Sequence, residues 1–149
     1  MSAPSRTTIR VRYAETDQMG VVYYANHFVW FEIGRVEFLR QLGFDYKQME
    51  TVDDCILPVV DASCRYKAPA RYDDALIIET RLLAMRSFVL KFGYRVLRPG
   101  EESGDASTQL LAEGETTHVI VDRHQMQKKV LPEKYRAVLR AQLAPVLAT

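Results

Sequence analysis

Alternating apolar and polar residues run through most of the chain and predict β-strands. The first alternating stretch covers residues 8–13, and four later ones cover residues 60–67, 78–84, 88–96 and 110–121. A period of two residues is typical of a strand with one buried and one exposed face. Because the last four follow one another without a long helix between them, we expect a largely antiparallel sheet.

One segment has the helical period instead. It runs from Asn26, a favourable N-cap residue, to about residue 42, and Gly43 is a natural stop signal. Apolar residues cover nearly its whole circumference, a pattern typical of a buried helix. Glu32 and Arg35 lie three positions apart on this helix, which predicts a buried ion pair between them.

The order of these elements predicts the fold class. A strand, a long helix and four further strands favour an α+β fold in which a curved antiparallel sheet of about five strands wraps the central helix. A loop over residues 98–107 and a modest helix over residues 132–143 complete a single domain, residues 1–149. The small residues Ala112 and Gly114 would let another element approach the sheet closely. One sheet covers only part of such a helix, so we expect a partner subunit.

Charge and cysteine usage narrow the function classes. The net charge is +1 with 26% charged residues, which argues against a nucleic-acid binder. No apolar run has the length of a signal peptide or of a membrane span. Cys55 and Cys64 match neither a redox pair nor a zinc motif, so we expect free thiols and a cytoplasmic protein. His27, His118 and His124 lack metal-ligand spacing, so no metal site is expected.

Chemistry concentrates in the connection between the first strand and the helix. Asp17 lies there, a few residues before the helix start, and Gly20 would allow backbone to approach a ligand closely. Amides at a helix N-terminus can polarise a carbonyl and stabilise an oxyanion. A carboxylate beside such amides can act on the same carbonyl as nucleophile or general base.

These residues resemble a known family, the hotdog-fold acyl-CoA thioesterases of the 4-hydroxybenzoyl-CoA thioesterase type, and especially its YbgC-like branch. The block from Glu15 to Asn26 carries the specific part of the resemblance, and further matching pieces follow in the same order along most of the chain. These pieces are Phe31-Glu32 with Arg35, residues 66–74, Val121-Asp122 and Leu131-Pro132.

The resemblance implies an acyl-CoA thioesterase that needs no cofactor and works as a homodimer or homotetramer with its active sites at the subunit interface. Asp17 matches the catalytic carboxylate, and Tyr24 matches the residue whose backbone N–H stabilises the oxyanion. Whether Asp17 attacks the thioester or activates water stays open. We expect five further residues to contact the substrate: Gly20, Val22, Asn26, Arg86 and Ser87. The aryl-specific branch has a run of basic residues before its Ser-Phe pair, whereas this chain has only Arg86 before Ser87-Phe88.

Several alternatives remain at this stage. Glu32 could act as a second carboxylate, His27 could line the site, and His118 is expected to be a hydrogen-bonded core histidine. Other cations could meet coenzyme A phosphates: Arg65, Lys67, Arg71, Arg123, Lys128 and Lys129. The main alternative function is a non-catalytic acyl-CoA or acyl-carrier-protein binding module. A hydratase is disfavoured because its His-Asp loop is absent from the sequence.

Overall fold

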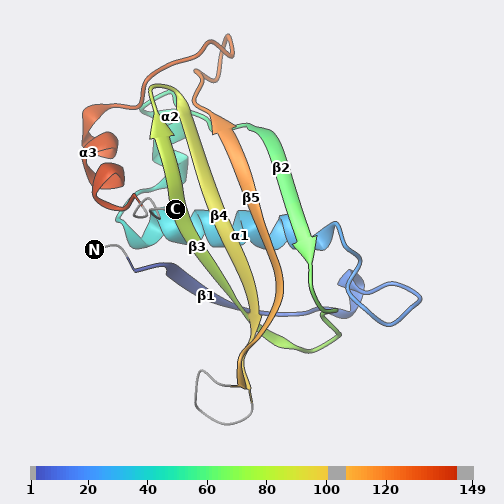
Figure 1. The fold of residues 1–149 in the computed structure, drawn as a ribbon. Coiled ribbons are helices and arrows are strands. Elements are labelled where there is room, and N and C mark those ends of the chain that lie inside the picture. The colour runs from blue at the N-terminus through green and yellow to red at the C-terminus, as the bar shows by residue number, and fades with distance from the viewer. Residues whose placement is uncertain (1–2, 101–106, 144–149) are drawn as a thin grey trace.

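The computed structural model describes residues 3–100 and 107–143 and contains one five-stranded sheet with strand order β1-β3-β4-β5-β2 (Figure 1). All four strand pairings are antiparallel. The strands are β1 (Ser5–Arg10), β2 (Val59–Tyr66), β3 (Ala75–Arg86), β4 (Val89–Arg98) and β5 (Gln109–Val119). The two edge strands are therefore β1 and β2, and they flank the consecutive antiparallel series β3-β4-β5.

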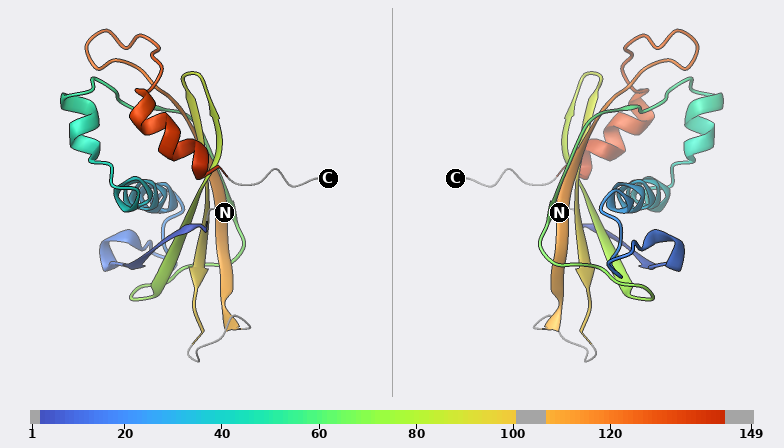
Figure 2. Two further views of the ribbon diagram at one scale, coloured as in Figure 1. Left: turned by 90° about the vertical axis from the view of Figure 1, so that its left-hand side faces the viewer. Right: turned by 90° about the vertical axis from the view of Figure 1, so that its right-hand side faces the viewer.

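Three helices pack on one side of this sheet, and no helix of residues 3–100 and 107–143 packs on the other (Figure 2). They are α1 (Asn26–Gln41), α2 (Tyr46–Thr51) and α3 (Glu133–Ala141), and a short 3-10 turn, η1 (Tyr13–Glu15), precedes α1. A single antiparallel sheet curving over a central helix confirms the α+β hotdog arrangement predicted from the sequence. None of the helices in the described part of the chain is long and apolar enough to cross a membrane.

Some predicted boundaries are wrong for identifiable reasons. The first strand spans Ser5–Arg10 rather than residues 8–13, because the chain leaves the sheet and Tyr13 begins the 3-10 turn. Asn26 is not the N-cap: Ala25 holds that position, and the Asn26 side chain donates to the carbonyl of Glu15 instead. Gly43 follows the helix in the left-handed conformation, as predicted. Of the predicted 98–107 loop, residues 101–106 lie outside the described residues.

The core lies between α1 and the sheet and combines many aliphatic side chains with a smaller set of aromatic ones. Phe31 of α1 stacks on Tyr94 of β4 with ring centroids 4.4 Å apart, and Phe38 meets Phe92 edge-on at 5.7 Å. Gly114 of β5 lies beneath this stack, where an added Cβ would be 2.6 Å from the Phe31 ring. The predicted close approach at this small residue is therefore confirmed, and the partner is the central helix.

Replacing Gly114 by alanine is expected to destabilise the protein by about 3 kcal/mol. The new methyl group would collide with the Phe31 ring and with the backbone carbonyl of Ser63, and overpacking against backbone is poorly relieved. Urea unfolding of Gly114→Ala and of Gly93→Ala provides the comparison. A methyl group on Gly93 would meet only the side chain of Leu83, at 2.9 Å, so this control should lose much less stability. Equal losses would refute the packing argument.

The central helix is buried less completely than its sequence predicts. Val29 and Ile33, one turn apart on α1, are 44% and 38% exposed. Every residue of β2 except Cys64 is exposed as well, including Val59 and Val60. An apolar helix face and a free strand edge therefore lie uncovered on this chain.

Candidate active site

A tight turn places Asp17 directly after the 3-10 turn. The Asp17 N–H donates to the carbonyl of Val21 at 2.8 Å, and the Gly20 N–H donates to the Asp17 carbonyl at 3.0 Å. Gly20 closes the turn with a φ of 80°, a conformation that favours glycine. The half-buried carboxylate accepts one hydrogen bond, from the Met19 N–H at 2.8 Å. Its second oxygen accepts none from the described residues, which leaves it available to a substrate.

The Asp17 turn is held against the segment that leads into β3. The Val22 N–H donates to the carbonyl of Ala70 at 2.8 Å, and Val21 forms a β-bridge with Arg71. Val22 is itself buried in the core. The backbone of the Asp17 turn is thus fixed on one side by residues some fifty positions later in the sequence.

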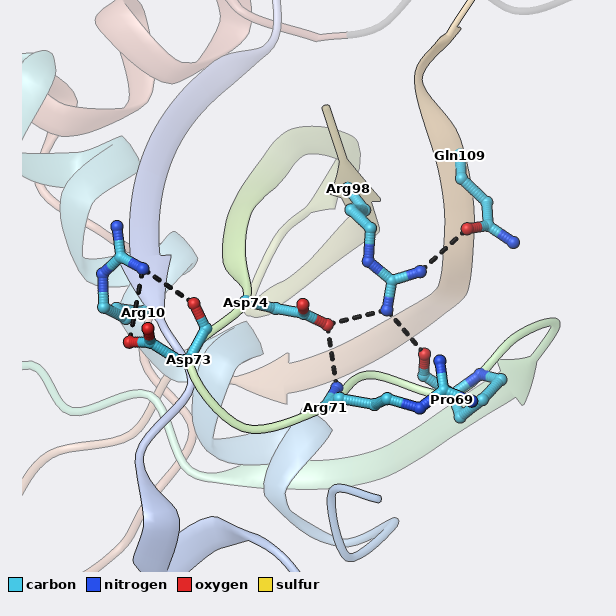
Figure 3. Close-up of polar contacts among 7 residues, drawn as sticks. All are labelled: Arg10, Pro69, Arg71, Asp73, Asp74, Arg98 and Gln109. Carbon is cyan, nitrogen blue, oxygen red and sulfur yellow. Dashed lines mark hydrogen bonds and ion pairs between the residues drawn. The ribbon is translucent and has the colours of Figure 1, made fainter. Parts of the chain in front are cut away.

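Figure 3 shows how that segment is itself fixed. The Arg98 guanidinium donates to the Asp74 carboxylate at 2.7 Å and to the Pro69 carbonyl at 2.8 Å. Asp74 accepts the Arg71 N–H at 2.8 Å, and neighbouring Asp73 has a φ of 67°. Asp73 and Asp74 therefore belong to the turn that leads into β3, and Asp74 stabilises it with its carboxylate. The network connects the end of β4 to the loop against which the Asp17 turn packs.

The helix start presents an unused N–H group. The Tyr23 N–H donates to the Glu15 carbonyl at 2.8 Å, and the Asn26 N–H donates to the Tyr23 carbonyl at 2.9 Å. Between them, the Tyr24 N–H donates to no acceptor in the described part of the chain. Tyr24 lies two residues before α1 begins, and an unpaired amide beside a helix N-terminus can donate to a developing oxyanion. The geometry around Tyr24 is compatible with the role implied by the resemblance.

Glu15 is a structural residue of the candidate site to which the sequence reasoning assigned no role. Its carboxylate is buried and accepts the Arg12 N–H at 2.7 Å and the Trp30 indole N–H at 3.0 Å. The backbone carbonyl of the same residue accepts the Tyr23 N–H and the Asn26 side-chain amide. Glu15 therefore joins the end of β1, the Asp17 turn and α1. The sequence offers no capping-box signal for Glu15, because Arg12 holds the N-cap position and an arginine side chain cannot accept a hydrogen bond.

His27 lies beside the Tyr24 turn and is buried. Its ring packs on Trp30 and Tyr66, with centroids 4.7 and 4.9 Å away. Nδ1 lies 3.2 Å from the Tyr24 carbonyl, which can only accept, so Nδ1 carries the proton and Nε2 has no partner among the described residues. Burial lowers the pKa of His27, and the hydrogen bond to Tyr24 opposes this. His27 thus supports the helix start as a neutral ring.

Two of the expected substrate contacts lie elsewhere in the chain. Arg86 and Ser87 are exposed at the β3–β4 hairpin, where Ser87 has a φ of 35°. The Asp17 turn packs near the beginning of β3, and Arg86 ends that strand, so a strand length of about 35 Å separates them (Figure 1). Within one chain, the hairpin therefore does not contribute to the surroundings of Asp17.

The predicted Glu32–Arg35 ion pair is wrong. Glu32 is exposed, whereas buried Arg35 donates to the Tyr94 hydroxyl at 3.1 Å. Tyr94 in turn contacts Thr116, whose hydroxyl lies 2.8 Å from Nε2 of His118. The correct partner of Arg35 lies 59 residues away in sequence, and helical spacing gives no information about it.

His118 is the hydrogen-bonded core histidine that the sequence predicts. Both ring nitrogens have partners, the Leu57 carbonyl at 2.9 Å and the Thr116 hydroxyl. Burial lowers the pKa of His118 to about 4. The imidazole is thus neutral at ordinary pH. No group of His, Cys, Asp and Glu side chains suited to a metal ion occurs within residues 3–100 and 107–143.

The lowered pKa of His118 gives a pH dependence of stability. In the unfolded chain His118 binds a proton below about pH 6.5, whereas in the folded protein it binds one only below about pH 4. The unfolded state therefore binds more protons as the pH falls, and the stability present at neutral pH is lost. We expect a loss of about 2 kcal/mol between pH 7.5 and pH 5 from this group alone. Urea unfolding at the two pH values measures it. His118→Gln should reduce the loss, whereas exposed His124→Gln should keep it; identical losses in all three proteins would contradict the assignment.

Comparison with known proteins agrees with this geometry. A family model described as the thioesterase-like superfamily matches residues 11–142. The chain is 35% identical to YneP of Bacillus subtilis, a proposed acyl-CoA thioesterase, over 92% of this chain and 96% of that protein. It is 35% identical to YbgC of Escherichia coli O157:H7, an acyl-CoA thioester hydrolase, over 86% of this chain and 90% of that protein.

A solved structure extends the comparison to three dimensions. The DHNA-CoA thioesterase from Staphylococcus aureus superposes with a TM-score of 0.82 at 28% identity, covering 93% of this chain and 91% of that chain. The family match covers the Asp17 turn, the helix start and the four strands β2, β3, β4 and β5. The chain therefore belongs to the thioesterase-like superfamily.

Proposed function

We propose that this protein hydrolyses acyl-CoA thioesters to a carboxylic acid and free coenzyme A. The observation that carries the proposal is that the connection between β1 and α1 presents two polar groups without partners. Asp17 has a carboxylate oxygen without a partner, and Tyr24 has a backbone N–H without an acceptor among the described residues. The relatives named as acyl-CoA thioesterases support coenzyme A as the carrier of the acyl group.

The proposed chemistry uses each group once. The thioester carbonyl oxygen accepts the Tyr24 N–H, which stabilises negative charge on that oxygen as the carbonyl is attacked. Asp17 either attacks the carbonyl carbon and expels the coenzyme A thiolate, leaving a mixed anhydride that water cleaves, or it takes a proton from an attacking water. Both routes consume one water and release one acid and one thiol.

We further propose that two copies of the chain assemble through β2 and the exposed face of α1, as a dimer or as part of a tetramer. The support is the free edge of β2 together with exposed apolar side chains from both elements. These side chains are Val29, Ile33, Val59, Val60 and Tyr66. Pairing there would satisfy the strand edge and bury apolar surface, as stable interfaces require.

In the proposed assembly, the other residues expected to contact the substrate come from both copies of the chain. Gly20, Val22 and Asn26 belong to the Asp17 turn and helix start, where they would shape the mouth of the site with their backbone. Arg86 and Ser87 would meet coenzyme A from a second copy, because the hairpin of the same chain lies at the far end of β3.

We propose a cytoplasmic location, which the free thiols of Cys55 and Cys64 support.

Hydrolysis in H₂¹⁸O tests this function and separates the two roles of Asp17. Over many turnovers, one ¹⁸O must enter the acid product; unlabelled acid, or acyl transfer to another acceptor, would refute hydrolysis. In a single turnover, label in the Asp17 carboxylate identifies Asp17 as the nucleophile, with water cleaving the anhydride at the aspartyl carbon. Label in the acid is expected if Asp17 activates water, or if water cleaves the anhydride at the acyl carbon.

A further inference from the structure

Tyr66 connects the sheet edge to the helix start. It is the last residue of β2, and its hydroxyl donates to the Tyr24 carbonyl at 2.8 Å. Its ring meets the Tyr24 ring edge-on at 6.3 Å and the His27 ring edge-on at 4.9 Å. The side chain thus contacts the turn that carries the unused Tyr24 N–H from the side of the sheet.

The hydrogen bond from Tyr66 is the shortest one on that carbonyl. The other two donors, the backbone N–H and Nδ1 of His27, lie 3.3 and 3.2 Å from the same oxygen. Both belong to the helix itself, so neither ties the turn to the sheet. Tyr66 alone among these donors fixes the turn relative to a different element.

The orientation of the Tyr24 N–H depends on this tie. The peptide units on the two sides of the Tyr24 Cα are linked through its φ and ψ angles, so fixing the carbonyl of Tyr24 restrains the direction of its N–H. An oxyanion donor stabilises a transition state only when it is held in place beforehand. On the other flank, the Glu15 carbonyl restrains Tyr23. Hydrogen bonds therefore fix the turn at Tyr23 and Tyr24 from two directions, one to the Glu15 loop and one to Tyr66 of the sheet.

We propose that Tyr66 is a positioning residue that orients the Tyr24 N–H for the thioester oxygen, an inference that rests on the proposed hydrolysis. Its hydroxyl is engaged with the Tyr24 carbonyl and acts on the reaction through that residue. Burial raises the pKa of Tyr66, so the hydroxyl stays protonated and donates throughout the working pH range. The hydroxyl, rather than the ring, carries the role.

Tyr66→Phe tests the proposal because it removes one oxygen atom and keeps the ring contacts with Tyr24 and His27. We expect kcat for acyl-CoA hydrolysis to fall about tenfold, the effect of one lost hydrogen bond, while KM changes less than twofold. The matched control is Tyr72→Phe. Tyr72 is exposed, packs edge-on with Tyr13 at 5.6 Å, and its hydroxyl has no partner among the described residues, so this variant should keep the wild-type kcat.

Binding of an S-alkyl-CoA thioether provides the second readout. The thioether has no carbonyl oxygen, so wild type and Tyr66→Phe should bind it with equal Kd and form the same assembly by light scattering. Wild-type kcat in Tyr66→Phe would overturn the proposal. So would a tenfold weaker thioether Kd, which would make the Tyr66 hydroxyl a substrate contact, or a changed assembly, which would show that this hydroxyl acts through the subunit interface rather than on Tyr24. An inactive Asp17→Asn with an unaffected Tyr66→Phe would refute the positioning role and leave the hydrolase function standing.

Discussion

Asp17→Asn should lose about 1,000-fold in kcat while the protein stays folded. Asparagine has the same shape, and its side-chain oxygen can still accept the Met19 N–H that holds the turn. The amide neither attacks a thioester nor takes a proton from water, and such groups contribute about 10²–10⁴-fold to rate. Release of free coenzyme A gives kcat, and urea unfolding should show stability within about 0.5 kcal/mol of wild type.

The matched control for this substitution is Asp73→Asn. Asp73 is an exposed aspartate in a turn, and its φ of 67° suits asparagine equally well. Asp73→Asn removes one charge, as Asp17→Asn does, and the only side-chain partner of Asp73 among the described residues is exposed Arg10, at 3.4 Å. We expect wild-type kcat from this control. An Asp17→Asn protein that keeps more than half of the wild-type kcat would remove Asp17 from the mechanism.

Val29→Glu combined with Ile33→Glu should convert the protein to monomers and reduce kcat/KM at least 100-fold. Both side chains are exposed on one face of α1, so an isolated chain tolerates glutamate there. In the proposed interface the new carboxylates would be buried without partners or placed against those of the second copy, which is costly. Because residues of both copies form the proposed active site, dissociation into monomers removes the activity as well. Light scattering and hydrolysis at one protein concentration measure both effects.

A double variant with the same charge change controls for this effect. Val52 and Val130 are also exposed valines, but they lie on the connections after α2 and before α3 rather than on α1 or β2. Val52→Glu with Val130→Glu should keep the assembly and the activity. A monomeric Val29/Ile33 variant with full activity would show that one chain carries a complete site, contrary to the proposal.

Long patterns in the sequence were sufficient for most of the fold. The alternating stretches of β3, β4 and β5 predicted those strands because one face of an antiparallel sheet packs on α1 and the other does not. The stretch of β2 also predicted a strand, although nearly all of β2 is exposed on this chain. The central helix ended where Gly43 predicts. By contrast, α2 was missed because six residues give too short a period to recognise, although Asp45 caps it by accepting the N–H groups of Lys47 and Gln48.

The candidate site was predictable in part, through its local motif. Asp17, Gly20 and Tyr24 lie within eight residues, and the structure places them on one turn and the adjoining helix start. Glu15 was given no role, because the pattern of the sequence does not show that its carboxylate meets the Trp30 indole fifteen positions later.

Interactions between distant segments were the part that sequence reasoning could not supply. Arg35 pairs with Tyr94 rather than with Glu32, and Tyr66 reaches Tyr24 across 42 positions. Spacing along one helix identifies neighbours on that helix only. The separation of Arg86 from the Asp17 turn follows from the antiparallel pairing of β1 with the beginning of β3. Alternation along a strand does not show which strands pair.

Turnover of a panel of acyl-CoA thioesters by the wild-type protein tests the central claim most directly. Short, medium, long and aromatic acyl-CoAs are incubated with enzyme, and free coenzyme A thiol is followed together with the melting temperature at the same ligand concentrations. The account predicts steady release of coenzyme A from at least one class, with a kcat of about 1 s⁻¹ or more. Thermal stabilisation by acyl-CoA without release from any member of the panel would contradict it and would identify the protein as a binding module.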